Sequence, residues 1–445
     1  MVGASPLASN YFHDEPTVEA MNLMGFDVGV LGNHEFDKGA EEMMRLIEGG
    51  SREDGSETSE KNFPGANFPY LAANVVEKES GEPVFPPHIV IERDGVRIGF
   101  IGVVTPETAE ISAPEVEASF DFLDMSETVN RYADELRGEG VEAIVVLAHS
   151  GGSEKNGVAS GEIVDEASGM DGAVDAVVAG HTHTYMNTRV GGAVVVEGGK
   201  YGETITAVDL SIDRTTGEVM ASSADIIPTY NDELRPDPEL RELVEGYTDR
   251  VAPISNRVVG TAAESINGSA TEAGESPLGN LVADARRAKT DADIAFVLTG
   301  ALPSGIEAGE VTYGGLSASH PGTNTLMSVE LTSGQIREAL ESQYRSDRDR
   351  VLQTSGLRFT HDPSRPLGDR ITSVTLENGT PLEEDETYTV AAEEFVAGGG
   401  NGFDVFTEGE NPTEHGAELD ALVEYLEGLP QPFEAPESGE RIRIG

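Results

Sequence analysis

Three short segments of the chain place a histidine directly after an apolar run. Their sequences are Gly32-Asn33-His34-Glu35-Phe36-Asp37, Ala148-His149-Ser150-Gly151-Gly152 and Gly180-His181-Thr182-His183. Neutral imidazole is a common ligand of divalent metal ions, and an asparagine amide oxygen can coordinate the same ion without adding charge. The residue types therefore predict a metal centre in which imidazoles bind one ion or two adjacent ones.

His34 is predicted to act in catalysis instead of binding a metal. Asp37 stands three residues further on, and such a carboxylate fixes the tautomer of an imidazole and stabilises its charged form. A protonated His34 can then assist the leaving oxygen of a phosphate ester. Asp175 is a candidate for orienting a ligand imidazole. The remaining histidines are interpreted as structural or surface residues: His13, His88, His320, His361 and His415.

Helices and strands alternate in the part of the chain that must position these residues. We expect helices over residues 16–24, 41–47 and 127–137, and strands over 27–31, 70–73, 88–92, 97–104, 143–148, 175–179, 194–197 and 205–212. Each histidine segment follows the carboxyl end of an apolar strand, and these ends share one edge of an α/β sheet. Segments far apart in sequence are therefore expected to meet in one crevice.

A second domain is expected after a charged, proline-punctuated stretch at 231–256, which contains a predicted helix over 238–251. It is a mixed α/β domain, with helices over 275–285, 333–341 and 417–426 and strands over 293–298, 371–376 and 387–392. Residues 49–62 are polar and lack an apolar period, which predicts a flexible surface loop.

Composition excludes several classes of function. The chain has 81 acidic and 29 basic residues, a formal net charge of −52, and no cysteine. The acidic balance argues against binding to nucleic acid or anionic membranes, which would need a basic face. The lack of cysteine excludes disulfides, zinc–thiolate sites and cysteine nucleophiles. The apolar runs are too short to span a bilayer. The acidic residues indicate a solvated surface suited to high salt, or an acidic interaction surface. An anionic substrate would then need local cations, which metal ions provide.

The three histidine segments resemble those of the calcineurin-like metallophosphoesterases. The whole chain, up to about residue 430, resembles the 5′-nucleotidase / UDP-sugar hydrolase / 2′,3′-cyclic-nucleotide phosphodiesterase family. Further matching segments are Glu15-Pro16-Thr17-Val18-Glu19-Ala20-Met21-Asn22, Tyr201-Gly202, Pro277-Leu278-Gly279-Asn280-Leu281, Val311-Thr312-Tyr313, Gln353-Thr354-Ser355-Gly356-Leu357 and Ala397-Gly398-Gly399-Gly400-Asn401-Gly402-Phe403.

The resemblance implies a fold and its boundaries. An N-terminal metallophosphoesterase domain, a four-layer α/β/β/α sandwich that is incomplete at its start, would cover residues 1–228. A linker helix would follow at 229–256, and a C-terminal mixed α/β substrate-binding domain at 257–445.

The resemblance also implies roles for individual residues. Asn33, His149 and His181 would bind one divalent ion, Zn, Mn or similar, and His183 would bind a second. His34 and Asp37 would form the catalytic dyad, and a metal-bound hydroxide would attack phosphorus. Phe403 would stack on a nucleobase, and Asn401 would contact substrate. The substrate would be a nucleotide or another small phosphate ester, and the protein would be extracellular or attached to the cell surface.

Two departures from the family pattern concern the metals. The family's Asp-x-His motif has no counterpart, and its bridging Asp would stand just before Met1. The chain thus retains ligands for about one ion, and no signal peptide is visible. We hypothesise that the true start lies upstream, where the first strand, the missing ligands and a secretion signal would be found.

Other departures concern the nucleotide pocket. The family's Asn-Gly-Gly-Gly-Ile-Arg segment corresponds to residues 298–303, from Leu298 to Pro303, and family aromatic positions correspond to Gly322 and Val351. Three functions stay open: a 5′-nucleotidase, a hydrolase of UDP-sugars, cyclic nucleotides or other phosphodiesters on the same centre, and a catalytically impaired binding module. The sequence does not give the oligomeric state.

Overall fold

The computed structural model describes residues 2–3, 5–52, 58–112, 114–231, 234–299, 302, 305–319, 325–346, 349–383 and 386–445. The chain forms two compact units. The first contains residues 12–245 together with Met1–Gly3, and the second contains Ala4–Tyr11 and Gly246–Gly445. The division falls within helix α8 (Pro238–Ser255). Both units mix helices and strands, as predicted.

A six-stranded sheet forms the centre of the first unit, with strand order β11-β12-β10-β7-β5-β4. Its inner strands are mutually parallel, and the two edge strands are antiparallel to their neighbours. The strands are β4 (His88–Arg93), β5 (Val96–Val104), β7 (Ala143–His149), β10 (Ala176–Val178), β11 (Tyr185–Val190) and β12 (Ala193–Gly198). Asp94 and Gly95, which join β4 to β5, both have positive φ, the geometry that a tight hairpin turn requires.

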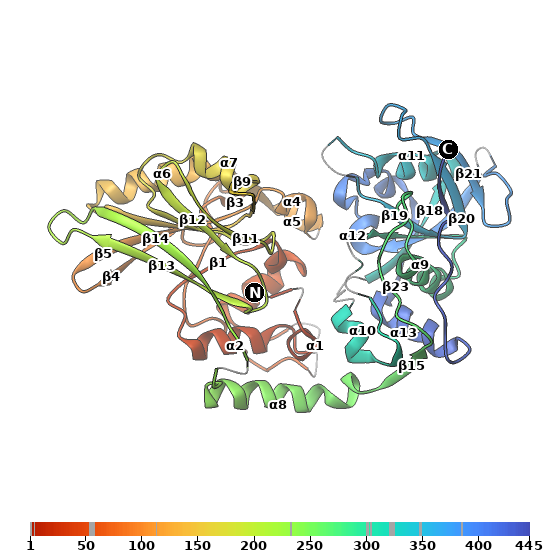
Figure 1. Ribbon diagram of the computed structural model, residues 1–445, viewed down its shortest axis with the longest axis horizontal. Coiled ribbons are helices and arrows are strands. Elements are labelled where there is room, and N and C mark those ends of the chain that lie inside the picture. The colour runs from red at the N-terminus through yellow and green to blue at the C-terminus, as the bar shows by residue number, and fades with distance from the viewer. Residues whose placement is uncertain are drawn as a thin grey trace. The chain divides into compact units, whose positions relative to one another are not determined.

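Side chains of β7 alternate between two apolar layers. Ile144, Val146 and Ala148 pack with helices α6 (Met125–Gly138) and α7 (Glu162–Gly169). Val145 and Leu147 face the hairpin of β13 (Thr204–Ile212) and β14 (Val219–Pro228). Figure 1 shows the two helices above the sheet and the hairpin across its other face. The central strands are therefore buried on both sides, which explains their continuous apolar sequence.

A smaller apolar layer carries the first histidine segment. It contains α2 (Glu15–Met24), α3 (Gly39–Glu48), β1 (Gly29–Val30) and β2 (Tyr70–Leu71), with Met21, Leu31 and Phe36 fully or almost fully buried. Helix α2 ends at Gly25, which takes the left-handed conformation of a C-cap. The other elements of the first unit are α4 (Thr108–Ile111), α5 (Pro114–Ser119), β3 (Val75–Glu77), β6 (Phe120–Phe122), β8 (Ser153–Lys155) and β9 (Val158–Ser160).

The ends of the predicted flexible loop at 49–62 are anchored. Gly50 pairs with Phe63, and Glu60 donates its backbone N–H to Glu15. Residues 53–57 of this loop lie outside the described part of the chain.

The second unit is built on a five-stranded sheet of order β19-β16-β22-β18-β23 and a three-stranded sheet of order β21-β20-β24. Its strands are β15 (Val258–Ala262), β16 (Ile294–Leu298), β17 (Gly309–Thr312), β18 (Thr325–Thr332), β19 (Leu352–Ser355), β20 (Leu357–His361), β21 (Ile371–Leu376), β22 (Thr387–Glu393), β23 (Glu410–Ala417) and β24 (Ile442–Ile444). Its α-helices are α1 (Leu7–Asn10), α9 (Pro277–Thr290), α10 (Tyr313–Ser319), α11 (Ser333–Ser342), α12 (Glu394–Ala397) and α13 (Glu418–Gly428).

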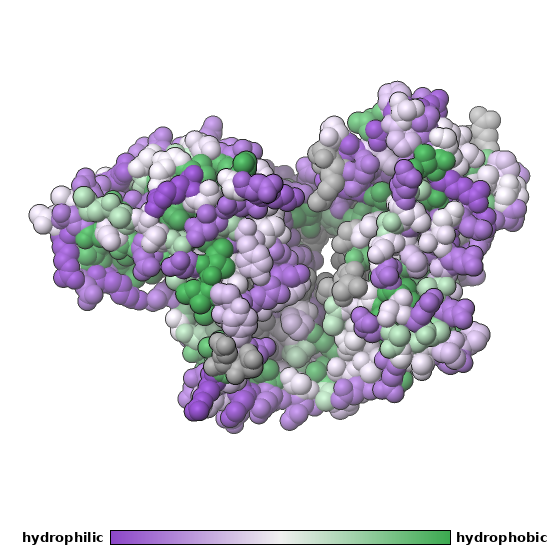
Figure 2. All heavy atoms as spheres, in the orientation of Figure 1, coloured by the Kyte–Doolittle hydropathy of each residue, from purple (hydrophilic) through white to green (hydrophobic). Residues whose placement is uncertain are grey.

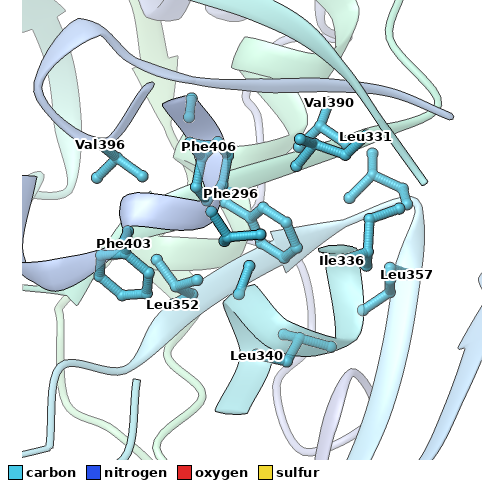
Figure 3. Close-up of a cluster of buried hydrophobic side chains, with 14 of the residues drawn as sticks. Phe296, Leu331, Ile336, Leu340, Leu352, Leu357, Val390, Val396, Phe403 and Phe406 are labelled. Atoms are coloured by element: carbon cyan, nitrogen blue, oxygen red, sulfur yellow. The ribbon is translucent and has the colours of Figure 1, made fainter. Parts of the chain in front are cut away.

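The core of the second unit lies between its sheets and α11. Ile294, Phe296 and Leu298 point from β16 into this core, where Leu340, Phe403 and Phe406 also lie (Figure 3). The alternate residue Val297 packs on the other face with α9 and α13. Hydrophilic residues cover most of the visible surface of each unit (Figure 2). Among the described helices, none combines the length and the apolar character that a bilayer span needs.

Candidate metal centre

The three histidine segments meet at one edge of the first unit's sheet. His149 is the last residue of β7, His181 follows β10 by three residues, and Asn33 begins a 3-10 helix just after β1. Asn33 Oδ1 lies 2.8 Å from His149 Nε2, which lies 3.3 Å from His181 Nδ1. The predicted meeting of these residues is confirmed. The parallel pairing of β7 with β10 brings His149 and His181 together, whereas Asn33 follows β1, which pairs with β2 outside the six-stranded sheet.

These separations fit the donor set of a single metal ion. Adjacent ligands at bond lengths of about 2.1 Å stand about 3 Å apart, as Asn33, His149 and His181 do here. Two imidazole nitrogens and an amide oxygen suit Zn, Mn or Fe. The arrangement of the described side chains is therefore compatible with one divalent ion.

Burial keeps both imidazoles in the neutral form that binds metals. Burial, with a smaller contribution from the charge of His181, lowers the pKa of His149 to about 3. Burial also lowers the pKa of His181, although the nearby carboxylates of Glu107 and Glu162 oppose this shift. At neutral pH each ring therefore has a lone pair available for an ion.

His183 makes no hydrogen bond to Asn33, His149 or His181 within the described part of the chain. It is exposed, and its ring centroid lies 5.8 Å from that of Tyr201. Among the described residues, no three His, Asp or Glu side chains gather as a metal site. A second ligand set is therefore not assembled by the described residues.

His34 and Asp37 form the expected pair. His34 Nδ1 lies 2.8 Å from Asp37 Oδ2, and the two side chains are 43% and 20% exposed. Burial lowers the pKa of His34, but the hydrogen bond and charge of Asp37 and the charge of Glu35 outweigh it, so this pKa is raised. The imidazole is thus biased toward its protonated form.

Gly3 packs directly against this pair. A Cβ at Gly3 would lie 2.6 Å from His34 Cβ and 2.7 Å from Asp37 Oδ2, and Gly3 has a φ of +86°. Its N–H donates to the buried carboxylate of Asp14 over 3.2 Å. Neither Gly3 nor Asp14 belongs to a motif that would point to this contact from the sequence.

Two carboxylates, the buried Glu197 and the exposed Glu162, hold the histidine loops and carry no motif of their own. Glu162 accepts hydrogen bonds from Ser150 at 2.6 Å and Thr105 at 2.9 Å. Glu197, at the end of β12, accepts one from the Thr182 hydroxyl at 2.9 Å. Glu197 carries the same signal as the histidines, because it is a polar residue at the end of an apolar strand; Glu162 has no comparable signal.

The predicted role of Asp175 is wrong. Its carboxylate accepts the N–H of Ile144 over 2.9 Å. Asp175 precedes β10, and Ile144 lies near the start of β7, so this contact is at the opposite end of the strands from His149 and His181. The residue before an apolar strand cannot reach the ligands that follow it.

Four of the other histidines are in structural contacts. His13 Nε2 lies 2.9 Å from Thr58 Oγ1, His88 lies 3.6 Å from Glu135, and His415 Nε2 lies 2.8 Å from Ser328 Oγ. His361 is buried and stacks on Tyr344 with 5.0 Å between ring centroids. His320 lies outside the described residues.

Phe403 does not occupy the position expected of a stacking aromatic. Its side chain is 0% exposed and packs in the core of the second unit, 6.4 Å from Phe406 between ring centroids (Figure 3). Its apolar ring is therefore satisfied by core packing, and no face is open to a nucleobase. Asn401 is half-buried, and its carbonyl accepts a hydrogen bond from Arg345 at 3.1 Å.

The other positions compared with the family's nucleotide pocket are apolar or undescribed. Leu298 is buried and Val351 is partly buried against the same core. The Thr299 hydroxyl donates a hydrogen bond to the carbonyl of Val351 at 2.6 Å, so the segment that follows Leu298 lies beside Val351. Pro303 and Gly322 lie outside the described residues.

A groove of about 620 Å³ runs along α11 in the second unit. Arg337, Glu338, Glu341 and Arg345 line it, together with Asp369. Because both carboxylates and guanidinium groups line it, the groove has no single charge that would define a ligand.

Comparison with known proteins assigns both units. Residues 10–185 match the family model of the calcineurin-like phosphoesterases, and residues 258–408 match that of the 5′-nucleotidase C-terminal domain. The 5′-nucleotidase precursor of Thermus thermophilus has a similar solved structure, with a TM-score of 0.79 and 28% identity, covering 99% of this chain and 87% of that one.

Two bacterial relatives are longer than this chain. Endonuclease YhcR of Bacillus subtilis is 34% identical over 446 residues, which cover 100% of this chain and 36% of the relative. Cell wall protein Lmo0130 of Listeria monocytogenes is 35% identical over 464 residues, which cover 96% of this chain and 59% of the relative. The chain thus spans between about a third and three fifths of their lengths.

Proposed function

Because the chain belongs to the family that joins a calcineurin-like phosphoesterase domain to a 5′-nucleotidase C-terminal domain, we propose that it is a metal-dependent hydrolase of phosphate esters. The observation that carries the proposal is the convergence of Asn33, His149 and His181, whose donor atoms lie 2.8 Å and 3.3 Å apart. The His34–Asp37 pair lies on the same segment as Asn33.

We propose that Asn33, His149 and His181 hold a divalent ion, with His183 as the remaining ligand toward a second. When bound, such an ion supplies Lewis acidity to a phosphoryl oxygen and lowers the pKa of water. The chain's own contribution is placement: the ends of β7 and β10 fix the two imidazoles, and burial keeps them neutral. His34, held by Asp37, donates a proton toward the leaving oxygen.

The chemistry of the second unit favours a phosphodiester or a simple aryl phosphate over AMP. Leu298 and Val351 offer no hydrogen-bonding side chain, and Phe403 is enclosed by the core. Apolar side chains at these described positions contribute little to recognition of a base. UDP-sugars and cyclic nucleotides stay within the proposed substrate class, and Asn401 is the remaining candidate for substrate contact.

A second candidate is a binding module without turnover. It is favoured by the lack, among the described residues, of a carboxylate grouped with the histidines as a metal ligand. Such a module would bind one ion weakly and release no phosphate.

Hydrolysis assays with added Mn²⁺ or Zn²⁺ test the two candidates. We expect turnover of a bis-aryl phosphodiester to exceed turnover of AMP, and His149→Ala to abolish it. His415→Ala is the matched control, because His415 contacts Ser328 in the second unit and its loss should leave the rate unchanged. Efficient, base-selective AMP turnover would refute the substrate proposal. Metal binding without hydrolysis of any phosphate ester would favour the binding module.

We further propose the domain division 1–228, 229–256 and 257–445, and an extracellular or cell-surface location. The relative named a cell wall protein supports this location. The partner is a small-molecule phosphate ester or nucleotide, since the net charge of −52 opposes binding to nucleic acid.

A further inference from the structure

The loop that bears two of the histidines has an uncommon backbone. His181 and His183 have φ values of 77° and 57°. Residues with a Cβ rarely adopt this left-handed region, and they remain there only where the surroundings over-determine the conformation. The loop at 180–184 must therefore be held by contacts outside itself.

Glu197 makes those contacts. Its side chain is 1% exposed. Its carboxylate lies 2.9 Å from the Thr182 hydroxyl and accepts the backbone N–H of Thr184 over 3.2 Å. Thr182 separates the two left-handed histidines, and Thr184 follows the second, so Glu197 restrains the loop on both sides of His183.

The same carboxylate also holds the loop that follows His149. It accepts the N–H of Gly152 over 3.2 Å. The Thr184 hydroxyl donates to the carbonyl of Gly152, and Gly180 donates its N–H to the carbonyl of Ser150 over 3.2 Å. The two histidine loops are thus joined to each other and to the end of β12.

The contact between the loops is too close for any other residue at position 151. A Cβ on Gly151 would overlap both Thr182 Oγ1 and the carbonyl oxygen of Gly180. The close approach lets one buried carboxylate reach donors in both loops.

We infer that Glu197 is a positioning residue for the metal centre. Through Gly152, Thr182 and Thr184 it fixes the placement of His149 relative to His181, so that their donor atoms lie 3.3 Å apart before an ion binds. The inference rests on the proposed metal centre. Loss of such a supporting contact typically lowers metal affinity about 10–100-fold.

Asp175 provides a matched control for Glu197. Its carboxylate also accepts a backbone N–H, that of Ile144, but at the opposite end of the same sheet. Removing either carboxylate deprives strand or loop backbone of an acceptor, whereas only Glu197 contacts the histidine loops. A general loss of stability would therefore appear when either carboxylate is removed. A loss of positioning of the histidine loops would appear only when Glu197 is removed.

The experiment compares the full chain with Glu197→Ala, Glu197→Gln, Thr182→Val and Asp175→Ala. Calorimetric titration with Mn²⁺ gives metal affinity, and spectra of metal-free protein labelled at histidine report the ring environments. We expect Glu197→Ala to shift and broaden the signals of His149, His181 and His183 and to weaken Mn²⁺ binding about 10–100-fold. Glu197→Gln, which keeps an acceptor oxygen, should recover most of the affinity, and Asp175→Ala should change neither readout.

Opposite outcomes overturn the inference. The inference is contradicted if Glu197→Ala keeps the wild-type histidine spectra and the wild-type Mn²⁺ affinity. It is also contradicted if Asp175→Ala loses as much Mn²⁺ affinity as Glu197→Ala. If Glu197→Ala does not fold, Thr182→Val still decides, since deleting one hydroxyl should shift the same histidine signals. If the wild-type chain binds no Mn²⁺, the proposed metal centre fails, while the metal-free spectra still show whether Glu197 holds the loops.

Discussion

His34 differs from the three candidate ligands in its surroundings. Its ring is hydrogen-bonded to Asp37, and its side chain is 43% exposed, whereas Asn33 is buried. A half-exposed imidazole with a carboxylate partner is suited to proton transfer to a bound substrate. We therefore propose different roles for these adjacent residues: Asn33 binds the metal ion, and His34 transfers a proton.

We predict that His34→Ala lowers kcat about 10²–10⁴-fold, the range of general acid catalysis, and leaves metal content unchanged. Elemental analysis of the same preparation used for kinetics provides the check. Asp37→Asn is the companion variant, since it keeps the shape of the partner but removes its charge, and it should give a smaller loss. Disappearance of the metal in His34→Ala would make His34 a ligand.

Phe403 is predicted to contribute to stability and not to substrate binding. Phe403→Ala should lower the free energy of unfolding by about 3–5 kcal/mol, as expected for a fully buried aromatic ring, with KM unchanged under conditions where the variant is folded. Phe406→Ala is the matched control, because Phe406 lies in the same core and is 1% exposed. A large rise in KM for Phe403→Ala alone would restore the stacking role.

The pKa of Asp175 predicts how pH affects stability at the other end of the sheet. Burial raises this pKa, against the hydrogen bond from Ile144. A raised folded-state pKa gives stability that is present below the unfolded-state pKa and is lost as pH rises through the folded-state value. The free energy of unfolding of Asp175→Asn should therefore equal that of the wild type at acidic pH. It should exceed the wild-type value as the pH rises toward neutral. Urea denaturation at several pH values measures this, and a variant less stable at pH 7 would contradict it.

At the scale of elements, a buried ion pair joins α2 to α3. Arg45 on α3 lies 2.7 Å from Glu15, the first residue of α2, and both are almost fully buried. Glu15 also accepts hydrogen bonds from Ser59 and Glu60. These contacts fix the layer from which β1 and Asn33 emerge.

Removing Arg45 should destabilise the first unit strongly, because Glu15 would keep a buried charge without its partner. We predict that Arg45→Met lowers the free energy of unfolding by about 3–5 kcal/mol. The double variant Arg45→Met with Glu15→Gln should recover part of this loss, since the uncompensated charge is gone. Equal stability of the single and double variants would show that the charge is not the cause.

The elements predicted best from sequence are those whose pattern has one explanation. The strand that became β7 was recognised from a continuous apolar run, which burial on both faces produces. The helix that became α6 was recognised from a helical period, which burial along one stripe produces. β18 and β23 were missed. β23 is a mostly exposed edge strand with the sequence Glu-Asn-Pro-Thr-Glu-His-Gly-Ala, which has no apolar alternation and pairs only because β18 offers an edge.

The candidate site was predictable where chemistry and strand ends coincide. Asn33, His149 and His181 were found in this way. Glu197 also lies at the end of an apolar strand, but its role depends on which loops the sheet order brings beside it, and no local pattern encodes that order. Asp175 was misjudged for the related reason that its place at the start of a strand sets it far from the ligands.

At the scale of the whole molecule, charge is the dominant feature. The formal net charge is −52, and the acidic residues are distributed along the whole sequence. Repulsion among them opposes the compact state, and it acts over about 10 Å at 0.1 M salt but over about 3 Å at 1 M. The free energy of folding should therefore depend on ionic strength, and this dependence should come from charges along the whole chain instead of from one site.

We predict that the midpoint of urea denaturation rises as NaCl increases from about 0.1 M to about 1 M, because screening shortens the range of repulsion in the folded state. Urea is uncharged, so it does not itself add screening. Choline chloride at equal ionic strength is the control: an equal rise indicates screening, and a smaller one indicates binding of sodium ions. A midpoint that does not change with salt would favour the alternative that the acidic surface serves an interaction.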